Sequence, residues 1–307
     1  MELYSRVKKI VILAAAWVIF LSGAAFAEVN VQYPPSVGLG NPFAVRITST
    51  EPITGVSAKW QGWNVPLDIT VWNNRYIALG LFGAQTGKVK TGTHPMKLTL
   101  QSNGKKRELT LSIKITPMKY KEDHLTLPES MVTPPANVLE RIAAERKAVG
   151  KALAAMSLAR NWGLPLIRPV EGIVTSPYGR QRILNKKPRA PHGGVDFRAA
   201  TGTPIKAALP GTVILTGDHY YAGKSVYIDS GGGVITLYFH LSSIDVKEED
   251  QVKKGAVIAK SGQSGRVTGP HLHFGLCLSG QHVNPEPIFT GTMADLLEKT
   301  ALVKVYL

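Results

Sequence analysis

The sequence predicts a mainly β protein in which two β-rich units are joined by one amphipathic helix. In the first unit, apolar residues alternate with other residues, as at Phe43, Val45 and Ile47, so that each strand would bury one face. From about residue 164 the chain returns to short strands and glycine-containing turns. A length of 307 residues is enough for two folded domains, each with its own hydrophobic core.

The first unit, residues 28–118, is expected to form a small, immunoglobulin-like β-sandwich. Its clearest hairpin joins an apolar run at 96–100 to another at 109–115. The turn between them, Ser102-Asn103-Gly104-Lys105, contains the Asn-Gly pair that favours a tight connection between antiparallel strands. Residues 28–118 therefore predict a domain built from paired strands.

Residues 119–163 are expected to connect the two domains. The first part, up to residue 135, is rich in charge and proline and has no clean period. A helix should follow, with Asn137 as a candidate N-cap and an apolar stripe that packs on one domain; the stripe comprises Val138, Ile142, Val149, Leu153 and Met156. The second domain is then expected at 164–290, followed by a C-terminal tail at 291–307.

The first 27 residues have the pattern of an export signal. A basic start precedes an apolar run at 10–21, and Ala25-Phe26-Ala27 supplies small residues for cleavage. An uncleaved anchor in the inner membrane is the alternative, and both place the body in the periplasm or cell envelope. The formal net charge of +15 favours polyanionic partners, and export makes the cell wall or membrane surface a better candidate than nucleic acid. A single cysteine, Cys277, excludes a disulfide within the chain.

Residues capable of metal and proton chemistry gather in the second domain. In the segment GPHLHFG, His271 and His273 alternate with apolar residues, so a strand would direct both imidazoles to one face. His192 and Asp196 lie four residues apart in PHGGVDF, and His240 lies in LYFHLS. A catalytic zinc ion takes three such ligands and keeps one position for water. His192, Asp196 and one histidine of the pair would complete that set, leaving two imidazoles to move protons.

Together these motifs resemble the lysostaphin/LytM family of zinc endopeptidases. The resemblance covers about 169–289, including SPYGRQR from Ser176, the segment VKKGAVIAKSGQSG and the Val283-Asn284-Pro285 ending. It implies an antiparallel, duplicated-hybrid-motif-like β-sheet domain. It also implies that His192, Asp196 and His273 bind Zn²⁺, and that His240 and His271 form a catalytic pair that does not bind the metal.

The same resemblance implies a substrate, namely the cross-linked stem peptides of peptidoglycan. The D-alanyl–diaminopimelate bond is the first candidate, and glycine-rich bridges or secreted proteins are alternatives. Some relatives of this kind lack zinc and activate a cell-wall amidase instead, but all five groups are present here. A regulator or scaffold protein of the envelope is a further candidate partner, and the N-terminal domain could either position the enzyme or cover its groove.

Other residues are assigned to the surface or to the rim of the site. Tyr220 and Tyr221 are candidates to line the groove, whereas Arg180 and Arg182 are expected at the solvated surface even though they could contact substrate carboxylates. The remaining histidines are expected in loops or at the surface: His94, His124, His219 and His282.

Overall fold

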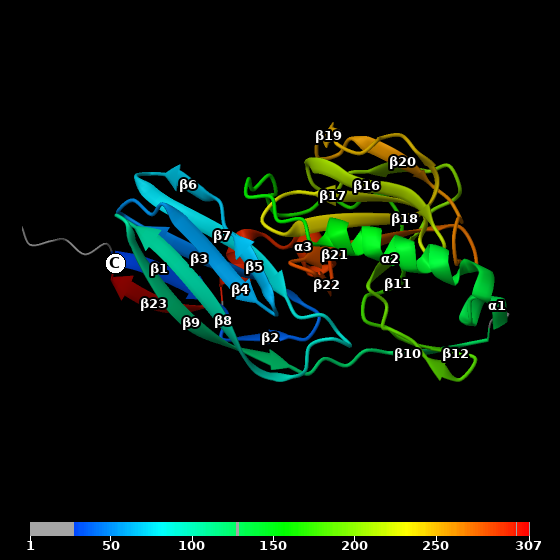
Figure 1. Ribbon diagram of the computed structural model, residues 1–307, viewed down its shortest axis with the longest axis horizontal. Coiled ribbons are helices and arrows are strands. Elements are labelled where there is room, and N and C mark those ends of the chain that lie inside the picture. Colours follow the sequence, from blue (N-terminus) through cyan, green and yellow to red (C-terminus); the bar gives the residue numbers. More distant parts are fainter. Residues whose placement is uncertain (1–27, 127–128, 299, 307) are drawn as a thin grey trace, which may run out of the picture.

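The computed structural model describes residues 28–126, 129–298 and 300–306, and within them the chain is mainly β (Figure 1). The expected export signal at 1–27 lies outside the described residues. In the described part, no helix is both long enough and apolar enough to cross a membrane. Two β domains lie end to end, and the long helix α2 (Leu139–Leu153) runs beside the second one.

The N-terminal domain is a sandwich of two sheets, as predicted. Alternate residues of each sheet, such as Val45 and Ile47 on one and Leu98 and Ile113 on the other, are fully buried in one shared core. The first sheet has the order β23-β1-β3-β7-β6: Ala301–Tyr306, Glu28–Tyr33, Pro42–Ser49, Arg75–Gly83 and Ile69–Trp72. The second has the order β2-β9-β8-β4-β5: Ser36–Gly38, Lys105–Thr116, Gly92–Ser102, Gly55–Trp60 and Trp63–Pro66.

The hairpin predicted at 96–115 is the longest pairing of this domain. Strands β8 and β9 are in antiparallel register as far as the Ser102–Lys105 pair. The two residues between them, Asn103 and Gly104, have φ values of 48° and 72°. A two-residue turn of this kind needs positive φ at both central positions, which asparagine and glycine tolerate. The Asn-Gly signal was therefore sufficient to locate the turn.

The last strand of the chain completes the first sheet. Strand β23 pairs with β1 along its whole length, from Glu28 opposite Tyr306 to Tyr33 opposite Ala301. Figure 1 shows the two strands side by side at one end of the molecule. The region 291–307, expected as a tail, thus contains a short helix, α4 (Met293–Leu297), and an integral strand of the N-terminal domain. The second domain is inserted between β9 and β23.

The connector has more structure than its composition indicates. Strand β10 (Glu122–Leu125) pairs in parallel with β12 (Gln181–Leu184), and a short helix, α1 (Glu129–Val132), follows. A 3-10 turn, η1 (Ala136–Val138), leads into α2. The N-cap of α2 is Val138, whose aliphatic side chain has no acceptor, so the expected cap at Asn137 is wrong.

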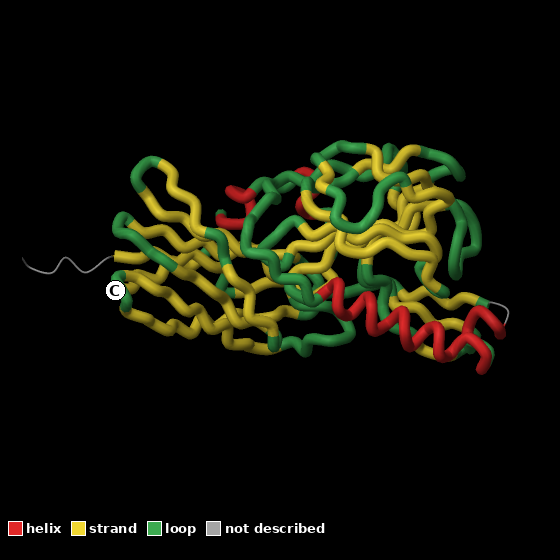
Figure 2. Tube along the Cα trace, turned by 45° about the horizontal axis from the view of Figure 1, so that its top comes forward, coloured by secondary structure: helices red, strands yellow, loops and turns green. Residues whose placement is uncertain are grey.

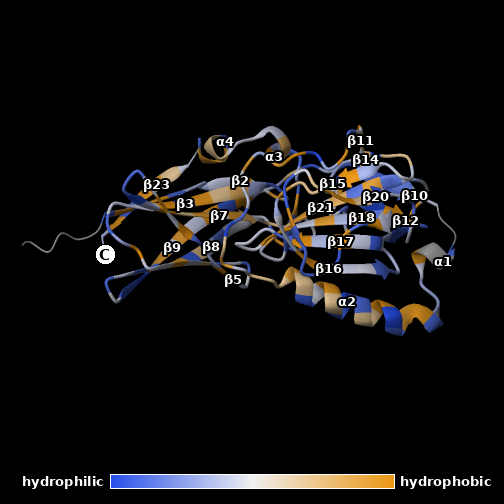
Figure 3. Ribbon diagram, turned by 90° about the horizontal axis from the view of Figure 1, so that it is seen from above, coloured by the Kyte–Doolittle hydropathy of each residue, from blue (hydrophilic) through white to orange (hydrophobic). Residues whose placement is uncertain are grey.

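Helix α2 packs on one face of the C-terminal domain, as predicted from its apolar stripe. Val149 and Leu153 contact a cluster that includes the buried residues Tyr227 and Leu237. Figures 2 and 3 both show the helix running along the sheet, and Figure 3 shows it next to β16 with apolar and polar residues alternating along it. The connector is therefore fixed to the second domain.

The C-terminal domain is built around one antiparallel sheet, which has ten strands in the described residues. Its main path runs β11-β14-β21-β18-β17-β16-β19: Val174–Ser176, Gly194–Arg198, His271–Leu278, Val234–Ile244, Gly223–Asp229, Gly211–His219 and Gln251–Val252. Three strands pair beside this path: β15 (Pro204–Lys206), β20 (Val257–Ser261) and β22 (Gln281–Val283). Strand β13 (Lys187–Pro188) pairs with β12, and helix α3 (Pro287–Thr290) follows the sheet.

A glycine turn joins the two central strands β17 and β18. Gly231, Gly232 and Gly233 have φ values of 87°, 61° and 74°, which side-chain-bearing residues rarely adopt. A Cβ on Gly231 would lie 1.8 Å from the carbonyl oxygen of Ala159. The three glycines therefore form the turn between these strands, and Gly231 is also needed for the close approach of the connector.

The pairing of β23 with β1 can be tested by a charge placed on its buried face. Val305 is 6% exposed, whereas Leu302 on the other face of the same strand is 55% exposed. We expect Val305→Asp to lower the free energy of unfolding by about 3 kcal/mol or more, because it buries an unpaired carboxylate. Leu302→Asp should change it by about 0.5 kcal/mol or less. Denaturant unfolding measures both, and equal losses would contradict the observed face of β23.

Candidate active site

Two adjacent central strands position three of the five predicted groups. Strands β14 and β21 are antiparallel, and Asp196 lies directly opposite His273. Directly opposed residues project from the same face of a sheet, and His271, two residues before His273, shares that face. Leu272 and Phe274 are fully buried on the other face. The alternation in GPHLHFG therefore has the consequence that was predicted from it.

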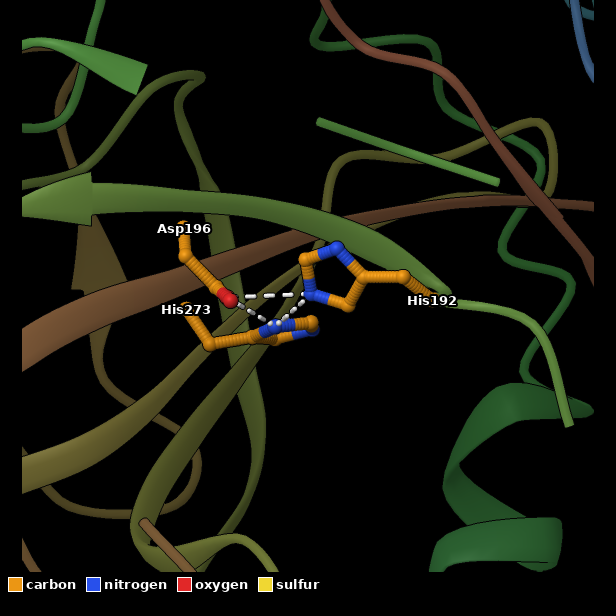
Figure 4. Close-up of side chains that lie close together, drawn as sticks. All are labelled: His192, Asp196 and His273. Carbon is orange, nitrogen blue, oxygen red and sulfur yellow. Dashed lines mark hydrogen bonds and ion pairs between the residues drawn. The ribbon is translucent and has the colours of Figure 1, made fainter. Parts of the chain in front are cut away.

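Three potential metal ligands converge on one point (Figure 4). The Nε2 atom of His192 lies 3.0 Å from Asp196 Oδ1 and 3.0 Å from His273 Nδ1, and His273 Nδ1 lies 2.8 Å from Asp196 Oδ1. His192 reaches this point from the loop before β14. It is 3% exposed and Asp196 is 7% exposed, so the cluster is shielded from water.

The tautomer of His192 shows that this cluster fits a cation. Its Nδ1 donates a hydrogen bond to the carbonyl oxygen of Pro177 at 3.0 Å, which leaves a lone pair on Nε2. That lone pair faces a carboxylate oxygen and a second imidazole nitrogen, an arrangement that a positive ion would stabilise. Tetrahedral zinc ligands at ordinary bond lengths lie roughly 3.3 Å apart, close to the spacing seen here. Two imidazoles and one carboxylate are a ligand set typical of catalytic zinc.

Shifted pKa values favour the metal-binding forms of Asp196 and His273. Burial would raise the pKa of Asp196, but its close polar contacts with His192 and His273 outweigh burial and hold this pKa well below its usual range. Burial lowers the pKa of His273, even though Asp196 acts in the opposite direction. At neutral pH the site thus presents an ionised carboxylate beside a neutral imidazole, the forms that bind a metal ion.

His240 and His271 lie beside this cluster and complete the predicted set of five. Their ring centroids are 4.8 Å apart, and His240 is 6.1 Å from the ring of His273. His271 Nε2 lies 3.9 Å from Asp196 Oδ1. Each ring donates from Nδ1 to a backbone carbonyl, His240 to Ser264 at 2.9 Å and His271 to Gly269 at 2.8 Å. Nε2 of each is then left to exchange a proton.

A strained backbone turns His240 towards the site. Its φ is 64°, a left-handed value that is rare for a residue with a side chain, and the pairing of β18 with its neighbours shifts register around it. Such irregularities redirect side chains and occur often at functional sites. Burial, together with repulsion from His273 and His271, lowers the pKa of His240 to about 3. The ring is therefore neutral at physiological pH.

A groove of about 520 Å³ opens over these residues. His192, His240 and His273 line it from the domain itself, and Phe239 stacks on His273 with ring centroids 5.2 Å apart. The connector contributes further lining residues: Val132, Pro134 and Arg146. The segment between the domains thus borders the candidate active site.

The sequence-based assignment of Arg182 to the solvated surface is wrong. This side chain is partly buried, lines the groove and places Nη2 3.4 Å from Asp196 Oδ2. Arg180 is also partly buried and pairs with Asp123. Tyr221 lines the groove as expected. Tyr220 instead packs edge-on against the ring of Tyr221, with ring centroids 5.0 Å apart.

Of the four remaining histidines, only His124 is clearly at the surface, with its side chain 69% exposed. His94 Nδ1 accepts a hydrogen bond from Gln61 Nε2, and His219 is half-buried with Nδ1 2.7 Å from Ser225 Oγ. His282, on β22, is partly buried, and burial lowers its pKa to about 4. The surface prediction is therefore wrong for His282.

Sequence reasoning missed Arg146 of the groove and two further basic residues. Arg189 follows β13, and Arg266 lies between β20 and β21 with its guanidinium 4.5 Å from the ring centroid of Tyr221. Neither belongs to a motif that suggests chemistry. Only the excess of positive charge in the chain pointed towards an anion-binding surface.

Comparisons with known proteins agree with this geometry. The family model described as "Peptidase family M23" matches residues 190–285, a range that includes all five groups. The peptidoglycan DD-endopeptidase ShyA of Vibrio cholerae is 47% identical over 95 residues, 31% of this chain and 22% of ShyA. The DD-carboxypeptidase/endopeptidase Mpg of Neisseria meningitidis is 38% identical over 112 residues, 36% of this chain and 26% of Mpg. The match thus spans about a quarter of these curated relatives.

One solved structure is similar over most of its length. A crystal structure from Pseudomonas aeruginosa, assigned to peptidase M23, is 32% identical with a TM-score of 0.57. The similarity covers 80% of this chain and 89% of that one. Because it extends over both domains and the His192, Asp196 and His273 cluster is intact, the chain belongs to peptidase family M23, a family of zinc metallopeptidases.

Proposed function

We propose that this protein is a zinc metalloendopeptidase that hydrolyses peptide cross-links of bacterial peptidoglycan, with the D-alanyl–diaminopimelate bond as its target. The observation that carries the proposal is the convergence of three metal ligands and two further imidazoles beside one groove, whose lining includes His192, His240 and His273. The names of two relatives support this choice of substrate. ShyA is named a peptidoglycan DD-endopeptidase, and Mpg is named a DD-carboxypeptidase/endopeptidase.

In this proposal His192 Nε2, Asp196 Oδ1 and His273 Nδ1 hold the zinc ion. A bound zinc ion lowers the pKa of water to about 7 and polarises a carbonyl group. The hydrogen bond from His192 Nδ1 to Pro177 fixes the ring so that Nε2 faces the metal position. Burial of the cluster strengthens its electrostatic interactions with substrate.

His240 and His271 carry the proton transfers. With Nδ1 donating to a backbone carbonyl, the neutral His240 ring presents Nε2 as a proton acceptor. His271 is anchored in the same way, and its ring lies beside that of His240. One imidazole accepts a proton from the attacking water and passes it to the departing amine, and the other stabilises the developing oxyanion.

The same residues disfavour a non-catalytic role. An activator of another hydrolase has no need of a buried carboxylate between two imidazoles, nor of His240 in a strained conformation. We also propose that the protein acts in the periplasm or cell envelope. The basic and apolar pattern of residues 1–27 and the net charge of +15 support that location.

The roles of Asp196 and His240 can be separated by two substitutions. Asp196→Ala should lose zinc and turnover together, because it removes a metal ligand. His240→Ala should retain zinc and lower kcat by about a hundredfold to ten-thousandfold, because it removes only proton transfer. Metal content is measured by mass spectrometry of the purified protein, and turnover on isolated peptidoglycan sacculi. Asp245→Ala, at an exposed acid of the same domain, is the matched control and should retain both. Loss of zinc from His240→Ala would contradict this division of roles.

The bond that is cut can be identified directly. Sacculi cross-linked through diaminopimelate should release products with a new D-alanine carboxyl group and a new diaminopimelate amine, detectable by mass spectrometry. Sacculi with glycine bridges and an unfolded secreted protein are the parallel substrates. Preferential cleavage of either would replace the proposed substrate, and equal product from wild type and Asp196→Ala would exclude the enzyme.

Removal of zinc should also lower thermal stability. Without the cation, three electron-rich atoms remain within 3.0 Å of one another in a buried site. Zinc at a free concentration about one hundred times its Kd should add about 2.7 kcal/mol of stability. Thermal unfolding before and after chelation, and again after zinc is restored, measures this change. Asp196→Ala should show no such shift, and an equal shift in that variant would place the ion elsewhere.

A further inference from the structure

Four arginine side chains line the candidate active-site groove: Arg146, Arg182, Arg189 and Arg266. They come from separate segments, helix α2, strand β12, the residue after β13, and the loop before β21. Among the described residues that line the groove there is no aspartate or glutamate. This set, which we call the arginine wall, gives the groove a strongly positive surface.

The arginine wall is held in place by its own contacts. The backbone N–H of Arg189 donates to the carbonyl of Arg182 at 2.9 Å, so the two flank one hairpin, and Arg189 Nη2 donates to Val132 O at 2.8 Å. The backbone N–H of Arg266 donates to Tyr221 O at 3.0 Å, and its guanidinium lies over the ring of Tyr221. Such anchoring reduces the entropy lost when the guanidinium groups bind a ligand.

Nearby acids neutralise this charge only in part. Arg182 lies 3.4 Å from Asp196, but the other oxygen of that carboxylate is occupied by His192 and His273. Other acids around the groove pair elsewhere, Glu145 with Arg141 and Glu129 with Lys187. Burial lowers the pKa of the Arg266 guanidinium, and repulsion from Arg182 and Arg189 adds to this effect. An anion in the groove would relieve that repulsion.

We propose that the arginine wall binds a carboxylate carried by the carbon atom that bears the scissile nitrogen. The inference rests on the proposed function and specifies how the groove selects its substrate. Guanidinium groups bind carboxylates through paired hydrogen bonds, and a carboxylate fixed beside the scissile bond would orient the carbonyl next to His240 and His271.

The chemistry of the cross-link supplies such a group. Diaminopimelate has two amino-acid ends, and one end is built into its own stem peptide. When the amine of the other end forms the cross-link, the carboxylate on the same carbon remains free. An internal glycine bridge has no carboxylate at that position. The arginine wall therefore favours the diaminopimelate cross-link over a glycine bridge.

The same chemistry has a second source. An uncross-linked stem peptide that ends in D-alanyl-D-alanine also has a carboxylate on the carbon bearing the scissile nitrogen. Cleavage there would release one terminal amino acid, a carboxypeptidase reaction. The groove recognises the same charge in both cases, so separate substrates must distinguish them.

The test compares matched synthetic substrates with the zinc-loaded, full-length protein. One is a cross-linked dimer with the carboxylate free, and its partner carries an amide there. A terminal D-alanyl-D-alanine peptide and its amide form the second pair. In the pair that corresponds to the natural substrate, amidation should lower kcat/KM by about tenfold to a hundredfold, because it removes a charge-assisted hydrogen bond.

Variants then assign the effect to the wall. Arg189→Gln and Arg266→Gln should each reduce the ratio of kcat/KM for the acid to kcat/KM for the amide by about tenfold. Arg189→Lys should retain part of this ratio, because lysine keeps the positive charge but lacks the planar guanidinium that binds a carboxylate through two hydrogen bonds. Arg75→Gln, at an exposed arginine of the N-terminal domain, is the matched control and should leave the ratio unchanged. The wild-type comparison remains decisive even where a variant folds poorly.

The outcomes separate this inference from the proposed function. Equal hydrolysis of acid and amide by the wild type would overturn the arginine wall as a carboxylate site and leave the endopeptidase intact. An equal loss of the acid-to-amide preference in the Arg75→Gln control and in the Arg189→Gln and Arg266→Gln variants would also overturn the carboxylate site. Hydrolysis of none of the four substrates by protein that has bound zinc would overturn both proposals.

Discussion

The antiparallel pairing of β14 with β21 is the constraint on which the rest of the site depends. It places Asp196 opposite His273 and fixes both on the same face as His271. A shift of one residue would turn all three side chains into the core and bring Leu272 and Phe274, now fully buried, to the groove. The hydrophobic effect that stabilises the sheet therefore also sets the register of the candidate metal site.

Three imidazole rings of the candidate active site are anchored to the backbone. His192, His240 and His271 each donate from Nδ1 to a main-chain carbonyl. These hydrogen bonds select the tautomer with the proton on Nδ1 in all three rings. Nε2 of each neutral ring is then left as an acceptor. The strained φ of His240 is the conformational cost of bringing the third ring to this position.

Local patterns predicted the parts of the structure that depend on local physics. Alternation located the strand with His271 and His273, and Asn103-Gly104 located a hairpin turn. The sequence could not show that β23 pairs with β1, because those residues are more than 250 positions apart and either strand alone is ambiguous. Arg182 was misplaced for a related reason. An isolated arginine is usually solvated, and only the fold reveals that Asp196 lies beside it.

The pairing of β1 with β23 also makes the N-terminal domain depend on residues that follow the C-terminal domain in the chain. The C-terminal domain lies wholly between these strands, so its sheet can close while β1 still has an unsatisfied edge. The first sheet of the sandwich gains its last strand only when residues 301–306 reach it. During synthesis this sheet therefore stays one strand short until the whole C-terminal domain has been made, because residues 301–306 come after that domain in the chain.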